Sequence, residues 1–123
     1  MNDVARALLA SDLNKSFVQG DETIKVLRGV SMQVVPGERV AIIGASEQVS
    51  ANIESSVHAT IISKMGDRGQ IAGAIIEGPL ALDLAVDKES AIIKKIDSEV
   101  AGDADCMLFH NIEAGNVFCK TNT

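Results

Sequence analysis

The chain contains 123 residues with a formal net charge of -6; 46% of them are hydrophobic and only 2% are aromatic. This length suits one domain with a modest core of aliphatic side chains. No apolar run approaches the ~20 residues that span a bilayer, and the first residues lack the basic and apolar regions of a signal peptide. We therefore expect a cytoplasmic protein without membrane insertion.

The negative charge is unevenly distributed along the chain. Residues 1–46 carry five basic and five acidic side chains, whereas residues 47–123 carry six basic and twelve acidic ones. Neither part contains a basic patch that would neutralise phosphates, so we expect no nucleic-acid partner. The contrast predicts two segments of different character.

The first segment has the pattern of β-strands. Residues 7–17 and 23–35 alternate loosely between apolar and polar side chains, and the turn formers Gly20 and Asp21 lie between them. This pattern predicts a hairpin. Pro36 and Gly37 then form a second turn before a short apolar strand at 39–44.

The second segment begins with a helical pattern. Ser55 or Ser56 is suited to cap a helix that ends at Gly66. One face of this helix would carry four larger side chains: His58, Ile61, Ile62 and Met65.

Strand and helix signals then alternate to the end of the chain. The apolar run 71–76 is typical of a strand buried on both faces, and Glu77-Gly78-Pro79 would turn the chain into a helix over 82–96. A buried strand at 106–109 precedes a last helix that opens at 113–116. These units predict an α/β fold with a small, mostly parallel sheet in which the two strands form a parallel pair.

Candidate site residues follow each of these two strands, because open α/β sheets bind ligands at the carboxyl ends of their strands. They are Gly78, Pro79 and Asp83 after the first strand, and Gly115, Asn116 and Lys120 after the second. Asn116, at a helix start, would offer donors to an anion, and Lys120 would add positive charge. The alternative is that both places are only tight turns followed by solvated helix faces.

Residues 1–46 carry a first family resemblance. The blocks LNKSF at 13–17, VLRGVS at 26–31 and PGERVAIIGAS at 36–46 resemble the opening of an ABC transporter ATPase of the lipoprotein-releasing or macrolide-exporter kind. The resemblance implies that the aromatic ring at Phe17 would stack on adenine and that the strand ending at Gly44 would lead into a phosphate-binding loop.

That loop is missing from the sequence. A phosphate-binding loop needs G-x-x-x-x-G-K-[ST], in which glycines let backbone N–H groups approach phosphate and Lys neutralises its charge. Gly44 is followed instead by Ala45, Ser46 and Glu47, with no second Gly and no Lys. We therefore expect no nucleotide binding, and an exporter ATPase subunit is only an alternative interpretation.

Residues 47–121 carry a second resemblance, to the phosphate acetyl/butyryl transferase family. Its blocks are SKMGDRGQI at 63–71, EGPLALD at 77–83, SEVAGDAD at 98–105 and NIEAGNV at 111–117, with Lys120. Both families place an apolar strand before Glu47, so the two resemblances join somewhere within 40–46. The sequence is thus interpreted as two domains, 1–46 and 47–123, the second an incomplete copy of the family fold.

The second resemblance implies transfer of an acyl group between coenzyme A and inorganic phosphate, without a metal or other cofactor. Coenzyme A and acyl phosphate are the implied ligands, and a homo-oligomer is an open alternative. The family's Ser-Arg motif lies beyond the segment matching 114–120, so we expect the chain to be an inactive fragment. The other interpretation is a non-catalytic chimera, from a natural fusion or a joined reading frame.

The remaining reactive side chains favour structural roles. His58 and His110 are isolated in the sequence, and Cys106 and Cys119 lack metal-ligand spacing. A catalytic Cys-His pair is the alternative interpretation. We expect reduced thiols and no metal site.

Overall fold

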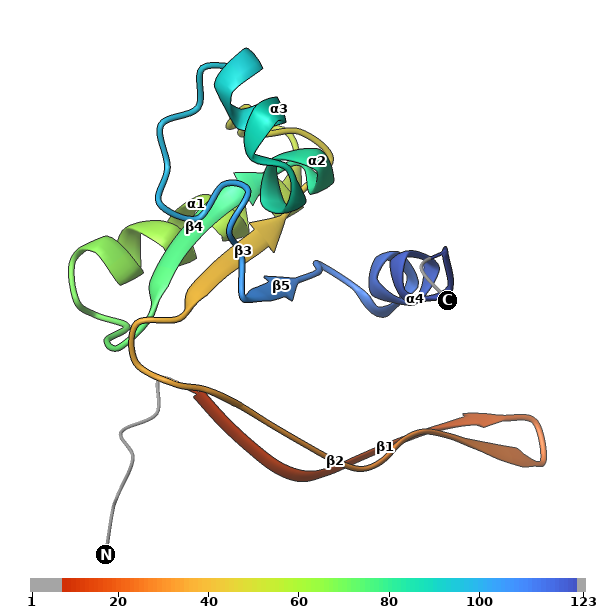
Figure 1. The fold of residues 1–123 in the computed structure, drawn as a ribbon. Coiled ribbons are helices and arrows are strands. Elements are labelled where there is room, and N and C mark those ends of the chain that lie inside the picture. Colours follow the sequence, from red (N-terminus) through yellow and green to blue (C-terminus); the bar gives the residue numbers. More distant parts are fainter. Residues whose placement is uncertain (1–7, 122–123) are drawn as a thin grey trace, which may run out of the picture.

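The computed structural model describes residues 8–121 and contains two separate β-sheets. Strands β1 (Leu8–Gln19) and β2 (Glu22–Val34) form an antiparallel hairpin. Strands β3 (Arg39–Ile43), β4 (Ile75–Leu80) and β5 (Cys106–Leu108) form a parallel sheet in the order β4-β3-β5. The hairpin extends below the parallel sheet (Figure 1).

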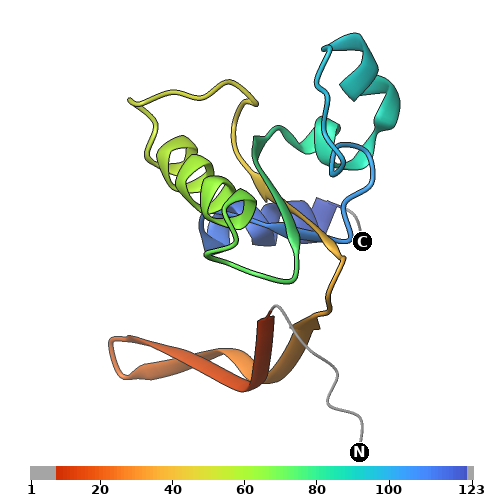
Figure 2. The same ribbon diagram turned by 90° about the vertical axis from the view of Figure 1, so that its left-hand side faces the viewer.

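Four helices accompany the parallel sheet: α1 (Glu54–Asp67), α2 (Leu82–Val86), α3 (Lys88–Ile93) and α4 (Ile112–Thr121). Helix α1 lies on one side of the strands, and α2 and α3 lie above them on the other side (Figure 2). The predicted α/β class and small parallel sheet are therefore confirmed. None of the helices within residues 8–121 has the length and apolar character needed to cross a membrane.

Strand β3 is the centre of the sheet, because it pairs with β4 on one edge and β5 on the other. The expected direct pairing of the two later strands is therefore wrong, although both run parallel to β3. A five-residue strand takes this place because Ala41, Ile42 and Ile43 are all buried.

Strand β4 lies further along the chain than the apolar run 71–76 predicts. It covers Ile75–Leu80, so Gly78 and Pro79 lie within the strand, joined by a cis peptide, and form no turn. A Cβ atom on Gly78 would lie 2.8 Å from the Ile42 Cβ and 3.3 Å from the Ala59 Cβ. Glycine is therefore required by close packing between β3 and α1, which the turn interpretation overlooked.

Helix α1 packs against the sheet through small side chains. Its buried residues are Ser56, Ala59 and Ser63, and the Ser63 hydroxyl donates to the Ile76 carbonyl at 3.2 Å. The predicted face is wrong in part, since His58 and Ile61 are exposed, whereas Ile62 and Met65 are half-buried. Small residues let the helix approach the strands closely, a reason that apolar periodicity alone does not reveal.

The ends of α1 also differ from the prediction. The helix begins at Glu54, and its N-cap residue Ile53 makes no side-chain cap bond. Ser56 instead accepts a hydrogen bond from the Ser50 amide at 2.9 Å and so holds the preceding loop. Gly66 lies inside the helix, and Gly69, with φ of +77°, follows its end.

The predicted helix over 82–96 is divided into α2 and α3. Asp87 between them has extended backbone angles, and its carboxylate caps α3 by accepting from the Glu89 amide at 3.1 Å and the Ser90 hydroxyl at 2.8 Å. A carboxylate before a helix competes with continued helix in this way. As a result Ile92 and Ile93 are exposed.

The core lies between the sheet and the α2–α3 side. It contains eight buried side chains: Ala41, Ile43, Leu80, Leu84, Ala85, Ala91, Val100 and Ala101. Leu84 and Val100 are the largest fully buried ones.

Candidate functional site

A groove of about 770 Å³ opens where the carboxyl ends of the three parallel strands meet. Ile43, Gly44 and Ala45 border it at the end of β3, Leu82 borders it after β4, and the segment 109–111 borders it after β5. Such an edge is the usual place for a ligand in an open α/β sheet. The groove therefore marks the candidate site.

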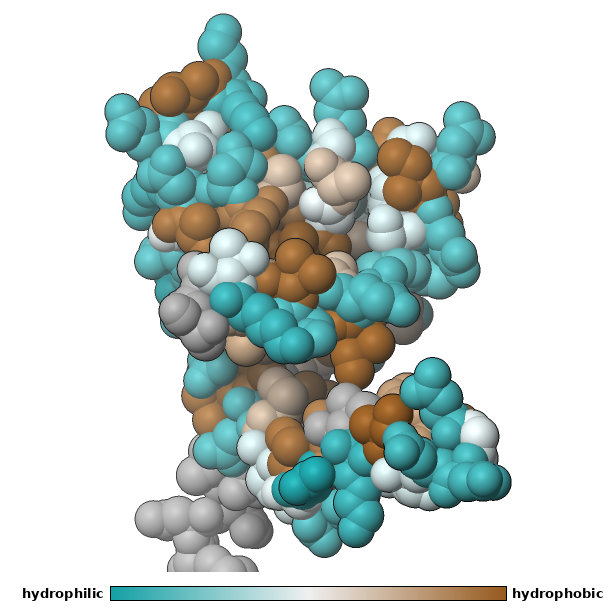
Figure 3. All heavy atoms as spheres, turned by 90° about the vertical axis from the view of Figure 1, so that its right-hand side faces the viewer, coloured by the Kyte–Doolittle hydropathy of each residue, from teal (hydrophilic) through white to brown (hydrophobic). Residues whose placement is uncertain are grey.

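Apolar side chains form most of the groove. They are Ile43, Leu82, Val86, Phe109, Val117 and Phe118. Four polar residues also line it: Ser55, His110, Asn111 and Thr121. Seen from the side on which α2 and α4 lie, hydrophobic residues gather at the middle of the molecule (Figure 3). This composition suits a ligand with an apolar part and a small polar part.

Helix α4 forms one wall of the groove. Asn111 positions its first turn, because the Asn111 side-chain oxygen accepts from the Ala114 amide at 2.8 Å. The Phe109 and Phe118 rings lie 5.2 Å apart between centroids. A Cβ atom on Gly115 would lie 3.6 Å from the Phe109 Cβ, so Gly115 faces that ring.

Ion pairs connect three segments near the groove: helix α2, the end of α3 and the loop that follows β3. The Lys94 ammonium lies 2.9 Å from the Asp83 carboxylate and 3.7 Å from that of Glu47. The hydrogen bond from Lys94 holds the pKa of Asp83 below its usual value of 3.8, and the same bond raises the pKa of Lys94 above 10.5. Lys94 thus joins α2 to the loop that follows β3.

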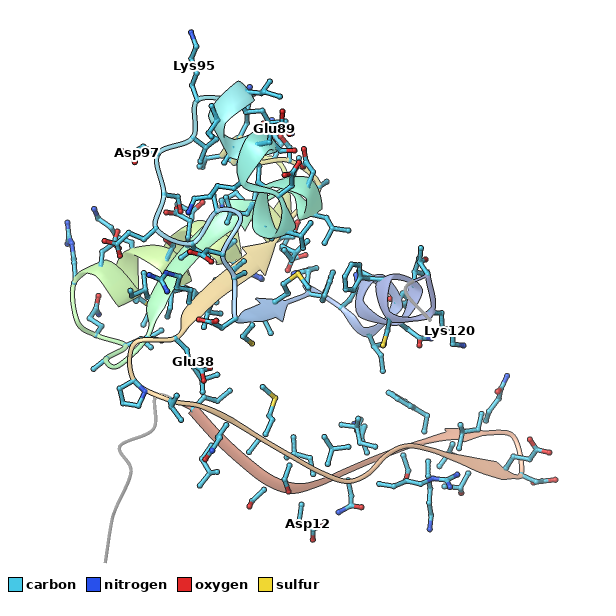
Figure 4. The ribbon with its side chains drawn as sticks, in the orientation of Figure 1. Asp12, Glu38, Glu89, Lys95, Asp97 and Lys120 are labelled. Atoms are coloured by element: carbon cyan, nitrogen blue, oxygen red, sulfur yellow. The ribbon has the colours of Figure 1, made fainter. Side chains whose placement is uncertain are left out.

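None of the six predicted site residues is among the residues that line this groove. Gly78 and Pro79 are buried in β4, and Asp83 is exposed in its pair with Lys94. Lys120 projects from α4 (Figure 4). Their neighbours Leu82 and Ala114 do line it, so the predicted loops are adjacent to the site. A binding role for the six residues stays a prediction.

The placement of Asn116 at a helix start is wrong. Helix α4 begins at Ile112 and Asn111 caps it, which leaves Asn116 in the middle of the helix. The sequence contained the signal, because an Asn three residues before Ala114 is suited to accept from that amide. Phe109, His110 and Asn111 line the groove, and the sequence pattern did not predict them.

The two histidines come together although they are distant in the sequence. The His58 and His110 rings lie 5.7 Å apart between centroids, and His58 Nε2 lies 3.8 Å from the Glu54 carboxylate.

Burial raises the pKa of the Cys106 thiol, with smaller contributions from Glu38 and Asp105. A thiol that stays protonated is a weak nucleophile.

Comparisons with known proteins agree with this geometry. The family model described as "Phosphate acetyl/butaryl transferase" matches residues 23–123. This match begins inside the segment 1–46 and overlaps the resemblance to an ABC ATPase over residues 23–46. A solved branched-chain phosphotransacylase from Enterococcus faecalis V583 superposes with a TM-score of 0.64 at 30% identity, over 71% of this chain and 31% of that one.

Curated enzymes give the same result. A phosphate acetyltransferase of Rhizobium meliloti is 49% identical over 69% of this chain and 27% of its own length. A phosphate butyryltransferase of Clostridium acetobutylicum is 43% identical over 84% and 33%, and a phosphate acetyltransferase of Thermotoga maritima is 37% identical over 96% and 42%. The chain thus spans between about a quarter and two fifths of the length of these relatives. It belongs to the phosphate acetyl/butaryl transferase family.

Proposed function

We propose that the groove is part of a phosphate acyltransferase site, in which an acyl group passes between coenzyme A and inorganic phosphate. The observation that carries this proposal is the position of the groove at the carboxyl ends of all three parallel strands. Relatives named as phosphate acetyltransferase and phosphate butyryltransferase support the reaction class.

The residues that line the groove suit the apolar end of such a ligand in one part and its polar end in another. The side chains of Leu82, Phe109 and Val117 suit an acyl group, because burying apolar surface is favourable. Asn111 and His110 lie beside the N-terminus of α4 and suit the polar end of a thioester or acyl phosphate. Acyl-coenzyme A is therefore the proposed ligand class.

We further propose that this chain alone does not turn over acyl-coenzyme A. No Lys or Arg belongs to the groove lining within residues 8–121. Transfer of the acyl group from a thioester to phosphate, with coenzyme A as the leaving group, needs donors for the phosphate charge and for the developing oxyanion; losing even one such donor costs about a hundred- to a thousandfold in rate. Ligand binding without detectable turnover is the expected behaviour.

Calorimetric titration with butyryl-coenzyme A tests the binding proposal. Val117→Asp places a charge on an exposed apolar residue of the groove and should weaken binding at least about tenfold, since the apolar contact is lost and a carboxylate faces an anionic ligand. Ile93→Asp makes the same kind of change outside the groove lining and serves as the control. Equal affinity of the two variants would place the ligand elsewhere.

Acyl-phosphate formation at high enzyme concentration tests the turnover proposal separately. We expect none from butyryl- or acetyl-coenzyme A with phosphate. Turnover that disappears in Asn116→Ala would show that the predicted residue in α4 supplies the missing donor and that the chain is active alone.

A non-catalytic chimera is the second candidate function. The resemblance of residues 13–46 to an ABC ATPase favours it, as does the hairpin that stands apart from the parallel sheet (Figure 1). In this candidate residues 1–46 would bind no nucleotide, because Ala45 and Glu47 follow β3 where a phosphate-binding loop needs glycine and lysine. Magnesium-ATP should leave the melting temperature unchanged; an increase that is lost in Phe17→Ala would contradict this expectation.

A further inference from the structure

The β1–β2 hairpin presents one apolar face along most of its length. Directly opposed residues share a face, and every second pair is largely apolar. These pairs are Leu8 with Val34, Ala10 with Met32, Leu13 with Val30, Lys15 with Leu27 and Phe17 with Ile24. The alternate pairs, such as Asn14 with Arg28 and Ser16 with Lys25, form the polar face.

Three β-bulges maintain this separation. An extra residue lies in β1 between Ala10 and Leu13, and extra residues lie in β2 at Gly29 and Val26. Each bulge resets the alternation of side chains, so that irregularly spaced apolar residues stay on one face. The apolar face is therefore a consistent feature of the hairpin and not a result of a single pair.

Only Val34, at the inner end of this face, is fully covered, with 3% of its surface exposed. Leu8 and Met32 border an apolar space of about 210 Å³ that Val40 and Ile42 of the sheet also line, but they are still 49% and 43% exposed. Residues of the outer half are 40–46% exposed: Leu13, Phe17, Ile24 and Val30. A two-stranded hairpin with one bare apolar face is marginal in water, because it lacks a third strand or a covering layer.

Charge distinguishes this face from the rest of the molecule. Residues 8–34 contain three basic and three acidic side chains, whereas residues 35–121 contain seven basic and thirteen acidic ones and hold a net charge of -6. Two copies that approach through their hairpins therefore avoid the like-charge repulsion that opposes contact elsewhere. A single cation, Lys15, lies on the apolar face, and its ammonium sits 5.1 Å from the Phe17 ring centroid.

We propose that the outer apolar face of the hairpin is covered by the same face of a second copy, in a closed twofold pair. A twofold contact uses one surface twice, so a largely apolar face on a hairpin without net charge suits it without any further partner. Packing two hairpins face to face produces two layers of two strands, the arrangement that an isolated hairpin lacks. Phe17 and Ile24 form the outermost apolar pair of the proposed contact.

Sedimentation velocity over a wide concentration range tests the pairing with a matched set of variants. Phe17→Lys places a charge on the apolar face, and Val18→Lys places the same charge on the adjacent residue of the opposite face, where Val18 is 77% exposed. We expect the unchanged chain and Val18→Lys to form dimers, and Phe17→Lys to raise the dissociation constant at least about tenfold. Circular dichroism should show the same folded content in both variants.

Hydrogen exchange gives a second measurement that does not depend on substitution. Amides of β1 and β2 should exchange more slowly as protein concentration rises, whereas those of β3 and β4 should not change. A monomer at every concentration, open-ended assemblies, or equal effects of the two lysine variants would each overturn the proposal. Binding of a monomer to neutral phosphatidylcholine vesicles that is lost only in Phe17→Lys would also overturn it, by assigning the face to lipid.

Discussion

The parallel-sheet part and the hairpin use similar apolar residues with opposite results. In the first part, Leu84 is fully buried and Val100 is 1% exposed, because α2, α3 and the following loop cover the strands. In the hairpin, Leu13 is 41% exposed although it is paired with Val30 across the strands. Strand pairing alone therefore does not bury a side chain; a second layer does.

The largest expected difference between the two parts is in hydrogen exchange. At low concentration, where the chain is monomeric, amides of β3 and β4 should exchange only through global unfolding, while those of β1 and β2 open locally. We expect protection factors that differ by a thousandfold or more, corresponding to about 4 kcal/mol. Equal protection would show that the hairpin and the sheet unfold as one unit.

Two glycines with positive φ sharpen the comparison. A Cβ atom on Gly102 would lie 2.5 Å from the Lys88 Cα and 2.6 Å from the Lys88 nitrogen, whereas one on Gly20 would meet no atom within 4 Å. Gly102→Ala should cost about 3 kcal/mol or more, because backbone must move. Gly20→Ala should cost about 1 kcal/mol through φ strain alone. Urea unfolding measures both, and equal costs would contradict the packing of the 102 loop on α3.

A pair of identical leucine truncations tests the same contrast through the burial of one side chain. Leu84→Ala empties a fully buried position and should lower the unfolding free energy by about 2–5 kcal/mol. Leu13→Ala removes a side chain that is already 41% exposed, and in the monomer it should cost less than about 1 kcal/mol. Chemical unfolding at low concentration compares the two variants; a reversed order would mean that the hairpin holds the better core.

The smallest expected effect concerns the ion pair beside the groove. Since the folded-state pKa of Asp83 is lowered, its stabilising contribution is present above the usual value of 3.8 and is lost as pH falls through the lower folded value. Asp83→Asn should therefore be less stable than the unchanged chain near neutral pH, and the two should converge in strong acid. Asp97→Asn, a change on another exposed acid, is the control. A constant difference at all pH values would exclude the pair as its cause.

Much of the fold was predictable because its signals are local. The hairpin, the short strand 39–43 and the strand at 106–108 match their patterns closely. The position of β4 was not predictable in this way, because Gly78 and Pro79 usually indicate a turn. Only the contact of Gly78 with Ile42 and Ala59, which are distant in the sequence, explains why a strand continues through them.

The candidate site was predictable only in its general place. The rule that ligands bind at carboxyl ends of strands predicted the edge of the sheet at which the groove opens. The lining residues depend on how α4 folds back, which is determined by the Phe109–Phe118 contact and by the Asn111 cap. These tertiary contacts have no periodic signature, so the sequence pattern led to Gly115 and Asn116 in place of Phe109 and Asn111.

Each bulge of the hairpin takes one residue out of the ladder and so decides on which face the following side chains lie. Each bulge acts as a shift of one residue in the phase of a two-residue repeat. Deleting Gly29 would leave Arg28 opposite Asn14 and residues 22–28 on their present faces, whereas a regular ladder that included Gly29 would turn these residues over and place Lys25 and Arg28 where Ile24 and Leu27 now lie. The bulge at Gly29 thus keeps an apolar surface from becoming a basic one without the replacement of any side chain.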